Sequence, residues 1–249
     1  MTPDDLLALF DVASAAQIGA LATLGPAERR ARTDRPGQYR LDVVADAAVL
    51  PILTAAGLRV LSEESGWSGP ADARVTVVLD PVDGSTNCAR ELPYWAISLC
   101  AVDADGPLCA LVQNGATRVR YTAVRGGGAH VDGNALRPST TTSLERAVVA
   151  LSGWPSTPLP WRQFRALGSA ALALCDVAAG HVDAYLDGIA DQHAPWDYLG
   201  GLLVCREAGA PVVDAHGREL GVLDGDARRQ LLAAGTTELI EALRPGIAA

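Results

Sequence analysis

The segment best suited to chemistry is Asp-Pro-Val-Asp-Gly-Ser-Thr-Asn at residues 80–87. It follows an apolar, β-branched run at residues 75–79, which predicts a buried strand. Asp80 and Asp83 would then lie at the rim of a sheet, beside a turn whose free backbone N–H groups can bind an anion. Two carboxylates repel a phosphate unless a cation lies between them, and oxygen ligands favour Mg²⁺, Mn²⁺ or Ca²⁺ over zinc. The segment therefore predicts a site for a divalent cation and a phosphate group.

Two further acidic segments could join this site. Glu63 and Glu64 follow a short strand-like run, and Asp197 opens a predicted helix. By themselves, adjacent glutamates in a loop and an acid in the first turn of a helix are common structural features. If the fold gathers Glu63, Asp80, Asp83 and Asp197, however, these carboxylates would raise one another's pKa, and cations would be needed to keep them all ionised.

The elements that must position these residues change character along the chain. Helical periodicity covers residues 3–24, 43–56, 169–179, 196–208 and 236–243. Strand-like runs cover residues 59–61, 75–79, 95–102, 108–114, 119–124, 147–151, 211–214 and 231–234. We expect an N-terminal α+β domain at residues 1–140, which carries the metal and phosphate loops on a mostly antiparallel sheet. A C-terminal α/β domain at residues 141–249 would carry the substrate contacts and the Trp-Asp segment.

Composition excludes several functional classes. The chain has 249 residues and a formal charge of -9, which argues against nucleic-acid binding. It contains no lysine, which excludes P-loop, Schiff-base and kinase chemistry and phosphatases of the haloacid-dehalogenase type. The five cysteines form no Cys-x-x-Cys pair, so reduced and mostly buried thiols are expected. An acidic N-terminus and the lack of an apolar run of about 18 residues predict a cytoplasmic protein without a membrane partner.

These motifs resemble those of the inositol monophosphatase superfamily of Mg²⁺-dependent, lithium-sensitive phosphatases. The family signatures Asp-Pro-Ile-Asp-Gly-Thr-x-Asn and Trp-Asp, the latter leading to Glu-Ala-Gly, match residues 80–87 and 196–210. Shorter matches occur in the family's order at residues 43–46, 62–65, 167–171 and 183–187. The resemblance implies the layered αβαβα sugar-phosphatase fold, with an antiparallel-sheet N-terminal half and an α/β C-terminal half.

The resemblance also implies a metal centre with two or three Mg²⁺ ions, or Mn²⁺ in their place. Glu63, Asp80 and the carbonyl of Val82 would hold the first ion. Asp80, Asp83 and Asp197 would hold the second, and a looser third ion would bind near Glu63. The family often carries a lysine before the segment at 43–46, and an arginine such as Arg35 or Arg40 could replace it here.

The same resemblance assigns the catalytic residues. Glu63 and the Ser85 hydroxyl would activate a water for hydrolysis of a phosphate monoester, and Asp46 would accept a hydrogen bond from Ser85. The positions that match the family's phosphate and substrate contacts are Gly84, Ser85, Gly168, Ser169, Ala170 and Asp187. All four histidines lie in turn-rich segments that suggest exposure, and His193, close to Asp197, is the best catalytic candidate among them.

The preferred hypothesis is hydrolysis of a small phosphorylated polyol, with inositol 1-phosphate as the first candidate substrate. An adenosine 3′,5′-bisphosphate 3′-nucleotidase is one alternative, although the short segment 152–165 offers little for base stacking. Histidinol phosphate and sugar phosphates are further candidate substrates. A catalytically silent metal- or phosphate-binding module is the alternative outside enzymes. A homodimer is expected from the family.

Overall fold

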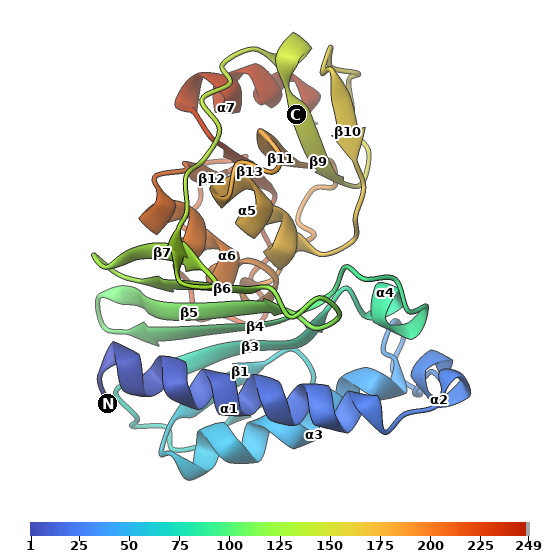
Figure 1. The fold of residues 1–249 in the computed structure, drawn as a ribbon, viewed down its shortest axis with the longest axis vertical. Helices are drawn as coiled ribbons and strands as arrows, with labels where there is room; N and C mark the ends of the chain where they lie inside the picture. The colour runs from blue at the N-terminus through green and yellow to red at the C-terminus, as the bar shows by residue number, and fades with distance from the viewer. Residues whose placement is uncertain (248–249) are drawn as a thin grey trace.

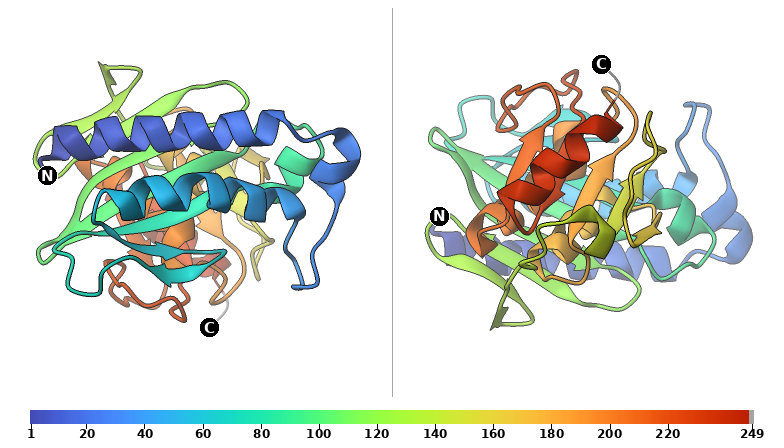
Figure 2. Two further views of the ribbon diagram at one scale, coloured as in Figure 1. Left: turned by 90° about the horizontal axis from the view of Figure 1, so that it is seen from below. Right: turned by 90° about the horizontal axis from the view of Figure 1, so that it is seen from above.

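Residues 1–247, which the computed structural model describes, form five layers in the order helix, sheet, helix, sheet, helix (Figure 1). The three helical layers are α1 (Pro3–Ala22) with α3 (Arg40–Ala55), α5 (Ala170–Ala178) with α6 (Pro195–Ala208), and α7 (Thr237–Leu243). Figure 2 shows α1 and α3 side by side across one face of the first sheet, and α7 over the outer face of the second. The predicted αβαβα fold is confirmed.

Both sheets are mixed. The first has the order β2-β1-β3-β4-β5-β6-β7-β8, and only β1 and β3 are parallel neighbours. Its strands are β1 (Arg59–Ser62), β2 (Gly66–Ser68), β3 (Thr76–Asp83), β4 (Ala96–Asp103), β5 (Gly106–Asn114), β6 (Arg120–Val124), β7 (Gly128–Val131) and β8 (Asn134–Ala135). The second has the order β10-β9-β11-β13-β12, with β10, β9 and β11 parallel. Its strands are β9 (Val148–Ser152), β10 (Gln163–Arg165), β11 (Ala184–Asp187), β12 (Val212–Asp214) and β13 (Leu231–Ala234).

The chain passes from the first sheet to the second after β8, through the 3₁₀ turn η1 (Leu144–Arg146). This crossing lies close to the domain boundary expected near residue 140. One hydrophobic cluster nevertheless includes side chains from both halves, such as Ala110 and Leu231. The division into two domains stays a prediction.

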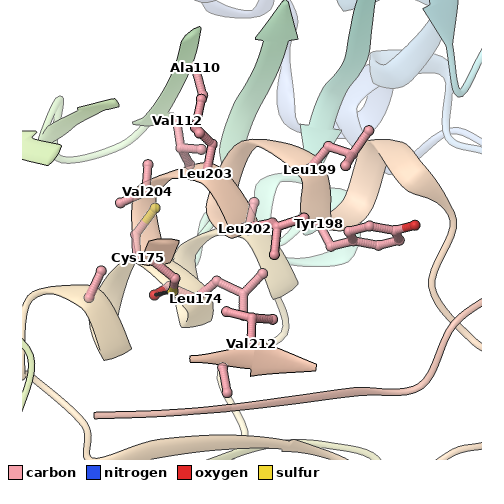
Figure 3. Packing of buried hydrophobic residues seen from close by; sticks show 14 of the residues in the cluster. Ala110, Val112, Leu174, Cys175, Tyr198, Leu199, Leu202, Leu203, Val204 and Val212 are labelled. Atoms are coloured by element: carbon pink, nitrogen blue, oxygen red, sulfur yellow. Dashed lines mark hydrogen bonds between the residues drawn. The ribbon is translucent and has the colours of Figure 1, made fainter. Parts of the chain in front are cut away.

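Helices α5 and α6 form the packed layer between the sheets. Figure 3 shows Leu203 of α6 beside Val112 of β5, and Leu174 of α5 nearer to Val212 of β12. The two helices approach so closely at Gly201 that a Cβ there would lie only 2.6 Å from the Leu174 Cβ. This close packing holds α6, which carries Asp197, firmly against both sheets.

Two local differences from the sequence prediction matter for the site. Strand β3 does not end at residue 79 but continues to Asp83, because a register shift in its pairing with β4 accommodates Pro81, which has no N–H to donate. Between the predicted helices at residues 3–24 and 43–56, where no helix was expected, the structure has the short helix α2 (Pro26–Arg30), which begins at a proline.

Among the helices of the described residues, α1 alone has the length and the apolar composition that a membrane-spanning helix needs. The prediction that no segment reaches this length is therefore wrong for residues 3–22. Leu6 and Phe10 of this helix are fully buried and belong to one cluster with Leu53 of α3 and Leu111 of β5. Its apolar character thus has a structural explanation, since α1 packs on α3 and on the first sheet.

All five cysteines, as predicted, are free and buried. Burial raises the pKa of the Cys88 and Cys109 thiols to about 12. These side chains therefore behave as small apolar groups of the core.

A half-buried ion pair, Asp214 with Arg218, stabilises the β12 edge of the second sheet. Asp214 is 2% exposed and accepts hydrogen bonds from the backbone N–H groups of His216, Arg218 and Gln230. The Arg218 guanidinium adds two hydrogen bonds, of 2.8 and 2.9 Å. Burial by itself raises the pKa of Asp214, but the hydrogen bonds from Arg218 and Gln230 outweigh it and lower the pKa to about 2.

We expect Asp214→Asn to lower the free energy of unfolding at neutral pH by roughly 2 kcal/mol, which corresponds to a pKa lowered from 3.8 to about 2. Because the folded-state pKa is depressed, this contribution is present above the unfolded pKa and is lost as the pH falls through about 2. Urea unfolding at neutral pH and near pH 2.5 (~ one unit below the usual value) measures the difference. Asp72→Asn, at an exposed position, is the control. A gap between variant and wild type that stays equal at both pH values would contradict the prediction.

Candidate active site

Three carboxylates from distant parts of the chain meet beside the first sheet. Glu63 directly follows β1, Asp80 lies in β3, and Asp197 lies in the first turn of α6. Because β1 and β3 are parallel neighbours, the Glu63 N–H donates to the Leu79 carbonyl at 3.1 Å, which places Glu63 near Asp80. One carboxylate oxygen from each of the three acids lies within 4.8 Å of the others.

The electrostatics of this cluster favour a bound cation. Burial raises the pKa of Asp80 and of Glu63 well above their ordinary values, and neighbouring carboxylates, including Asp197, raise both further. The Asp80 side chain is only 1% exposed, so water cannot screen these charges. A set of oxygen donors in this arrangement suits a hard divalent ion such as Mg²⁺ or Mn²⁺. The residues present therefore fit the metal that the sequence predicts.

Two other predicted metal ligands have hydrogen-bond partners within the chain. Asp83 Oδ2 accepts from the Ser169 hydroxyl at 2.5 Å and from the Ala171 N–H at 2.7 Å, at the start of α5. Burial raises the pKa of Asp83 to about 6, although these hydrogen bonds oppose the rise. The Val82 carbonyl accepts a hydrogen bond of 2.9 Å from the Ser85 hydroxyl. Asp83 thus links β3 to α5 and lies next to the cluster of three rather than within it.

The predicted hydrogen bond from Ser85 to Asp46 is wrong. Asp46 accepts a hydrogen bond from the Ser62 hydroxyl instead. Asp42 lies on the side of Ser85: its Oδ2 accepts the Tyr39 N–H at 2.8 Å, and its Oδ1 is buried without a partner among residues 1–247. Burial raises the pKa of Asp42 to about 6, while the nearby Ser85 hydroxyl, which can donate to it, lowers the pKa.

A shift of the helix start explains this error. The match at residues 43–46 assumes a helix that begins at Val43, whereas α3 begins at Arg40 with Tyr39 as its N-cap. The acid three residues after the N-cap, which bonds back to the cap, is therefore Asp42, and Asp46 lies one turn further along. In the sequence, the signal that could have identified Asp42 was an acid three residues after Tyr39, the spacing of a capping box.

Arg35, one of the two arginines that could replace the family's lysine, lies beside Glu63 and Glu64. Its Nη1 contacts the backbone carbonyls of Glu63 and Glu64 at 3.3 Å and the Glu64 carboxylate at 3.5 Å. A cavity of about 190 Å³ is lined by this arginine together with Asp42, Glu63 and Ser85. The cavity therefore brings Ser85 and Asp42 to a shared space with the predicted metal ligand Glu63.

A second cavity of about 390 Å³ adjoins Asp83 and Asp197. Gly168, Ser169 and Ala170, which the sequence places against the substrate, line it. Its volume suits a small organic ligand. The leaving alcohol of a phosphate ester could therefore lie in this cavity, next to the carboxylates.

Asp187 does not reach this cavity. It is fully buried, and its Oδ1 accepts the Ile189 N–H at 3.0 Å. His193 lines the cavity instead, with its Nε2 3.4 Å from Asp187 Oδ2 and 2.8 Å from the Tyr185 hydroxyl. The Nδ1 atom of this histidine lies 3.5 Å from Asp197 Oδ2. The expectation that Asp187 touches the substrate is therefore not supported, because His193 lies between it and the cavity.

His193 is also the exception to the expectation of exposed histidines, since only 6% of it is exposed. Burial lowers its pKa, but the hydrogen bond and charge of Asp197, together with the charges of Asp187 and Asp83, raise it more. The net effect is a pKa above the ordinary value, so the ring is held between acids as a hydrogen-bond donor.

Gly84 forms the turn between β3 and α4 (Ser85–Ala89). It has a φ of 94°, in the left-handed region that favours glycine. A Cβ there would lie 3.0 Å from the Gly168 carbonyl and 3.2 Å from the Trp95 Cβ. The absence of a side chain therefore lets the turn approach the wall of the larger cavity.

The segment 152–165 carries more aromatic surface than expected. Trp154 packs edge-to-face against Phe164 and Trp161, with ring centroids 5.3 and 6.3 Å apart. Trp154 is 59% exposed and Phe164 43% exposed. Ring stacking is thus available near the cavity, although neither residue lines it.

Comparison with known proteins gives consistent results. The model of the inositol monophosphatase family matches residues 50–247. A Nus factor named SuhB from Escherichia coli is 33% identical over 200 residues, which cover 74% of this chain and 71% of the relative. A fructose-1,6-bisphosphatase/inositol-1-monophosphatase from Methanothermobacter thermautotrophicus is 32% identical over 224 residues, which cover 81% and 80%. A hypothetical protein from Pyrococcus horikoshii with similarities to inositol-1 monophosphatase has the same fold, with a TM-score of 0.84 at 23% identity, covering 99% of this chain and 98% of that one.

Proposed function

Because this chain belongs to the inositol monophosphatase family, we propose that it is a Mg²⁺-dependent phosphatase that hydrolyses the phosphate monoester of a small polyol. The observation that carries this proposal is the convergence of the Glu63, Asp80 and Asp197 carboxylates, with oxygens within 4.8 Å of one another, next to two cavities. A catalytically silent binding module would not need Ser85 and Asp42 beside this cluster, nor a cavity for an alcohol.

Glu63, Asp80 and Asp197 would hold the metal, and Asp83 would join them by turning from Ser169. When bound there, divalent ions neutralise the carboxylates and the phosphoryl oxygens and make a water more acidic. Asp80 is central because it lies between residues from two other elements and is the most buried of the three. The protein's part is to hold these oxygens at fixed positions before substrate arrives.

Ser85 and Asp42 would orient the attacking water. Ser85 now donates to the Val82 carbonyl. If its proton turns to the unpartnered Oδ1 of Asp42, the Ser85 oxygen can accept a hydrogen bond from the water, and the Val82 carbonyl becomes available as a ligand. Glu63, which lines the same cavity, would accept the proton that the water loses.

The phosphate and the alcohol would occupy adjoining positions beside the carboxylate cluster. We assign the phosphate to the N–H groups of Gly84 and Ser85, because the left-handed Gly84 leaves this turn without an obstructing side chain. We assign the alcohol to the larger cavity, where Ser169 and His193 offer polar groups. Inositol 1-phosphate is the first candidate substrate, and the name of the Methanothermobacter relative adds fructose 1,6-bisphosphate.

The test is a phosphate-release assay on inositol, histidinol, sugar and nucleotide phosphates, each with Mg²⁺ and with a chelator. We expect turnover of at least one polyol phosphate that depends on the metal. A protein that binds Mg²⁺ but releases no phosphate from any of these esters would support the silent module instead. Turnover restricted to adenosine 3′,5′-bisphosphate would support the nucleotidase alternative. The homodimer and the cytoplasmic location stay predictions.

His193→Ala should change the ranking of substrates. The histidine is the polar side chain that covers Asp187 at the cavity wall, so its removal eliminates a hydrogen bond to the alcohol and uncovers a buried carboxylate. We expect KM for the preferred polyol phosphate to rise about tenfold, with a smaller change in kcat.

The control for this variant is His216→Ala, at an exposed histidine whose side chain has no hydrogen bond among the described residues. Steady-state kinetics over the same panel of esters measures both variants. An unchanged KM for all substrates in the His193 variant would show that the alcohol binds elsewhere.

A further inference from the structure

A third cavity lies outside the site described above. It has a volume of about 340 Å³ and is lined by Arg30, Arg32, Tyr39, Ala89 and Arg90. These residues come from α2 and the segment after it, the N-cap of α3, and the end of α4. Figure 1 shows α2 and α4 next to each other at one end of the molecule. None of the five residues lines either of the cavities at the carboxylates.

The positive charge of this cavity is not neutralised by an ion pair among the described residues, although Arg32 acts on Asp42 at longer range and lowers its pKa. No ion pair among residues 1–247 involves Arg30, Arg32 or Arg90, although acidic residues outnumber basic ones by 29 to 20. The neighbouring Arg35, by contrast, contacts the Glu64 carboxylate. An arginine cannot lose its proton to relieve repulsion from like charges. Three such groups around one space therefore favour a bound anion.

The three arginines are exposed, but contacts within the fold position part of the cavity. The Arg32 guanidinium lies 3.4 Å from the centre of the Tyr39 ring and donates to the Gly37 carbonyl at 2.7 Å. Tyr39 is only 6% exposed, and its hydroxyl lies 3.2 Å from the Thr86 hydroxyl. Arg30 Nε donates to the Ala89 carbonyl at 3.4 Å, which leaves its terminal nitrogens available. At least two of the three guanidinium groups are thus positioned by the fold before any ligand binds.

We propose that this arginine cavity binds a phosphate group. Planar guanidinium groups match the oxygens of a phosphate, and the cavity has room for one phosphate with a small organic group attached. The ligand would be either inorganic phosphate, which the proposed reaction releases, or the second phosphate of a substrate that carries two. Tyr39 connects the cavity to the catalytic residues, because its N–H bonds to Asp42 and its hydroxyl contacts the residue after Ser85.

Binding is tested on the metal-free protein, so that the result does not depend on the proposed activity. With a chelator present, the buried carboxylates repel phosphate, and the arginine cavity should be the site that binds it. Isothermal titration with inorganic phosphate at constant ionic strength should show one saturable site. We expect binding at least tenfold weaker in Arg32→Gln and in Arg90→Gln. The matched control is Arg74→Gln, at an exposed arginine outside the cavity, which should bind like wild type.

Arg90→Gln is included because Arg32→Gln also removes the stacking on Tyr39 and could perturb the start of α3. Thermal unfolding of each variant checks this. Equal phosphate affinity in wild type and both variants, or heats that chloride reproduces at the same ionic strength, would overturn the proposal.

Kinetics with the Mg²⁺-loaded enzyme then separate the two sources of phosphate. If the cavity binds the second phosphate of a substrate, the cavity variants should raise KM for a polyol bisphosphate and leave KM for the monophosphate unchanged. If the cavity binds free phosphate, the added phosphate should change the turnover of wild type in a way that excess substrate does not reverse. The cavity variants should lose this non-competitive effect. Loss of phosphate binding without any polyol phosphatase activity would leave the cavity established and refute only the proposed function.

Discussion

Asp80→Asn should reduce Mg²⁺-dependent phosphate release by more than about a hundredfold. Loss of residues that only support a metal ligand commonly costs 10–100-fold, and Asp80 contributes an oxygen to the cluster itself. Asparagine has the same shape, and its carbonyl can still accept the hydrogen bond of 2.8 Å from the Val82 N–H. The loss should therefore arise from the missing charge rather than from misfolding.

Thermal unfolding distinguishes these two causes. Burial raises the pKa of Asp80 in the folded protein, so its ionisation above the ordinary pKa destabilises the metal-free fold. Without metal at neutral pH, the variant should therefore be at least as stable as wild type. The rise in Tm on adding Mg²⁺, which measures metal binding, should largely disappear. A variant that keeps both its Mg²⁺-induced stabilisation and its turnover would refute the metal site.

Asp42→Asn should lower kcat by about a hundredfold or more, the scale expected when a positioned proton acceptor is lost. The asparagine carbonyl would replace Asp42 Oδ2 as the acceptor for the Tyr39 N–H. The amide nitrogen would then point to Ser85, where it donates a hydrogen bond instead of accepting one. The hydroxyl would be turned the wrong way for the water, while the three acids of the metal cluster remain in place.

Asp46→Asn is the matched control, because it changes an acid of the same helix to the same amide. Its carbonyl can still accept the Ser62 hydroxyl, so kcat should change by less than about threefold. The Mg²⁺-induced rise in Tm should be retained in both variants. Severe loss of kcat in the Asp46 variant, with a mild effect in the Asp42 variant, would restore the assignment made from the sequence.

The arginine cavity adds a possible link between these predictions. Tyr39 caps α3 through Asp42 and also forms the wall of the cavity under Arg32. An anion bound at Arg32 would therefore be connected through Tyr39 to Asp42, the residue proposed to orient the water through Ser85. The inference stands on the arrangement of the arginines and does not require the catalytic role of Asp42.

The long motifs made much of the architecture predictable. An apolar run ending in Asp80 indicated a buried strand with acids at its end, and the helix that carries Asp197 was predicted to within one residue of its start at Pro195. The layered fold followed from the resemblance and is confirmed. Such features depend on local patterns of apolar and β-branched residues, which a single sequence displays directly.

The sequence by itself determined which acids could form a metal centre, because residue types and strand ends are local properties, and its resemblance to a known family indicated the fold. Only the tertiary structure decided which acid faces Ser85, which side chain lines the alcohol cavity, and that three arginines share a space. A difference of three residues in the start of α3 moved the first-turn acid from Asp46 to Asp42. The burial of Asp187 behind His193 likewise depends on how the end of β11 lies against the segment before α6, since contacts between distant segments follow from packing rather than from spacing along the chain.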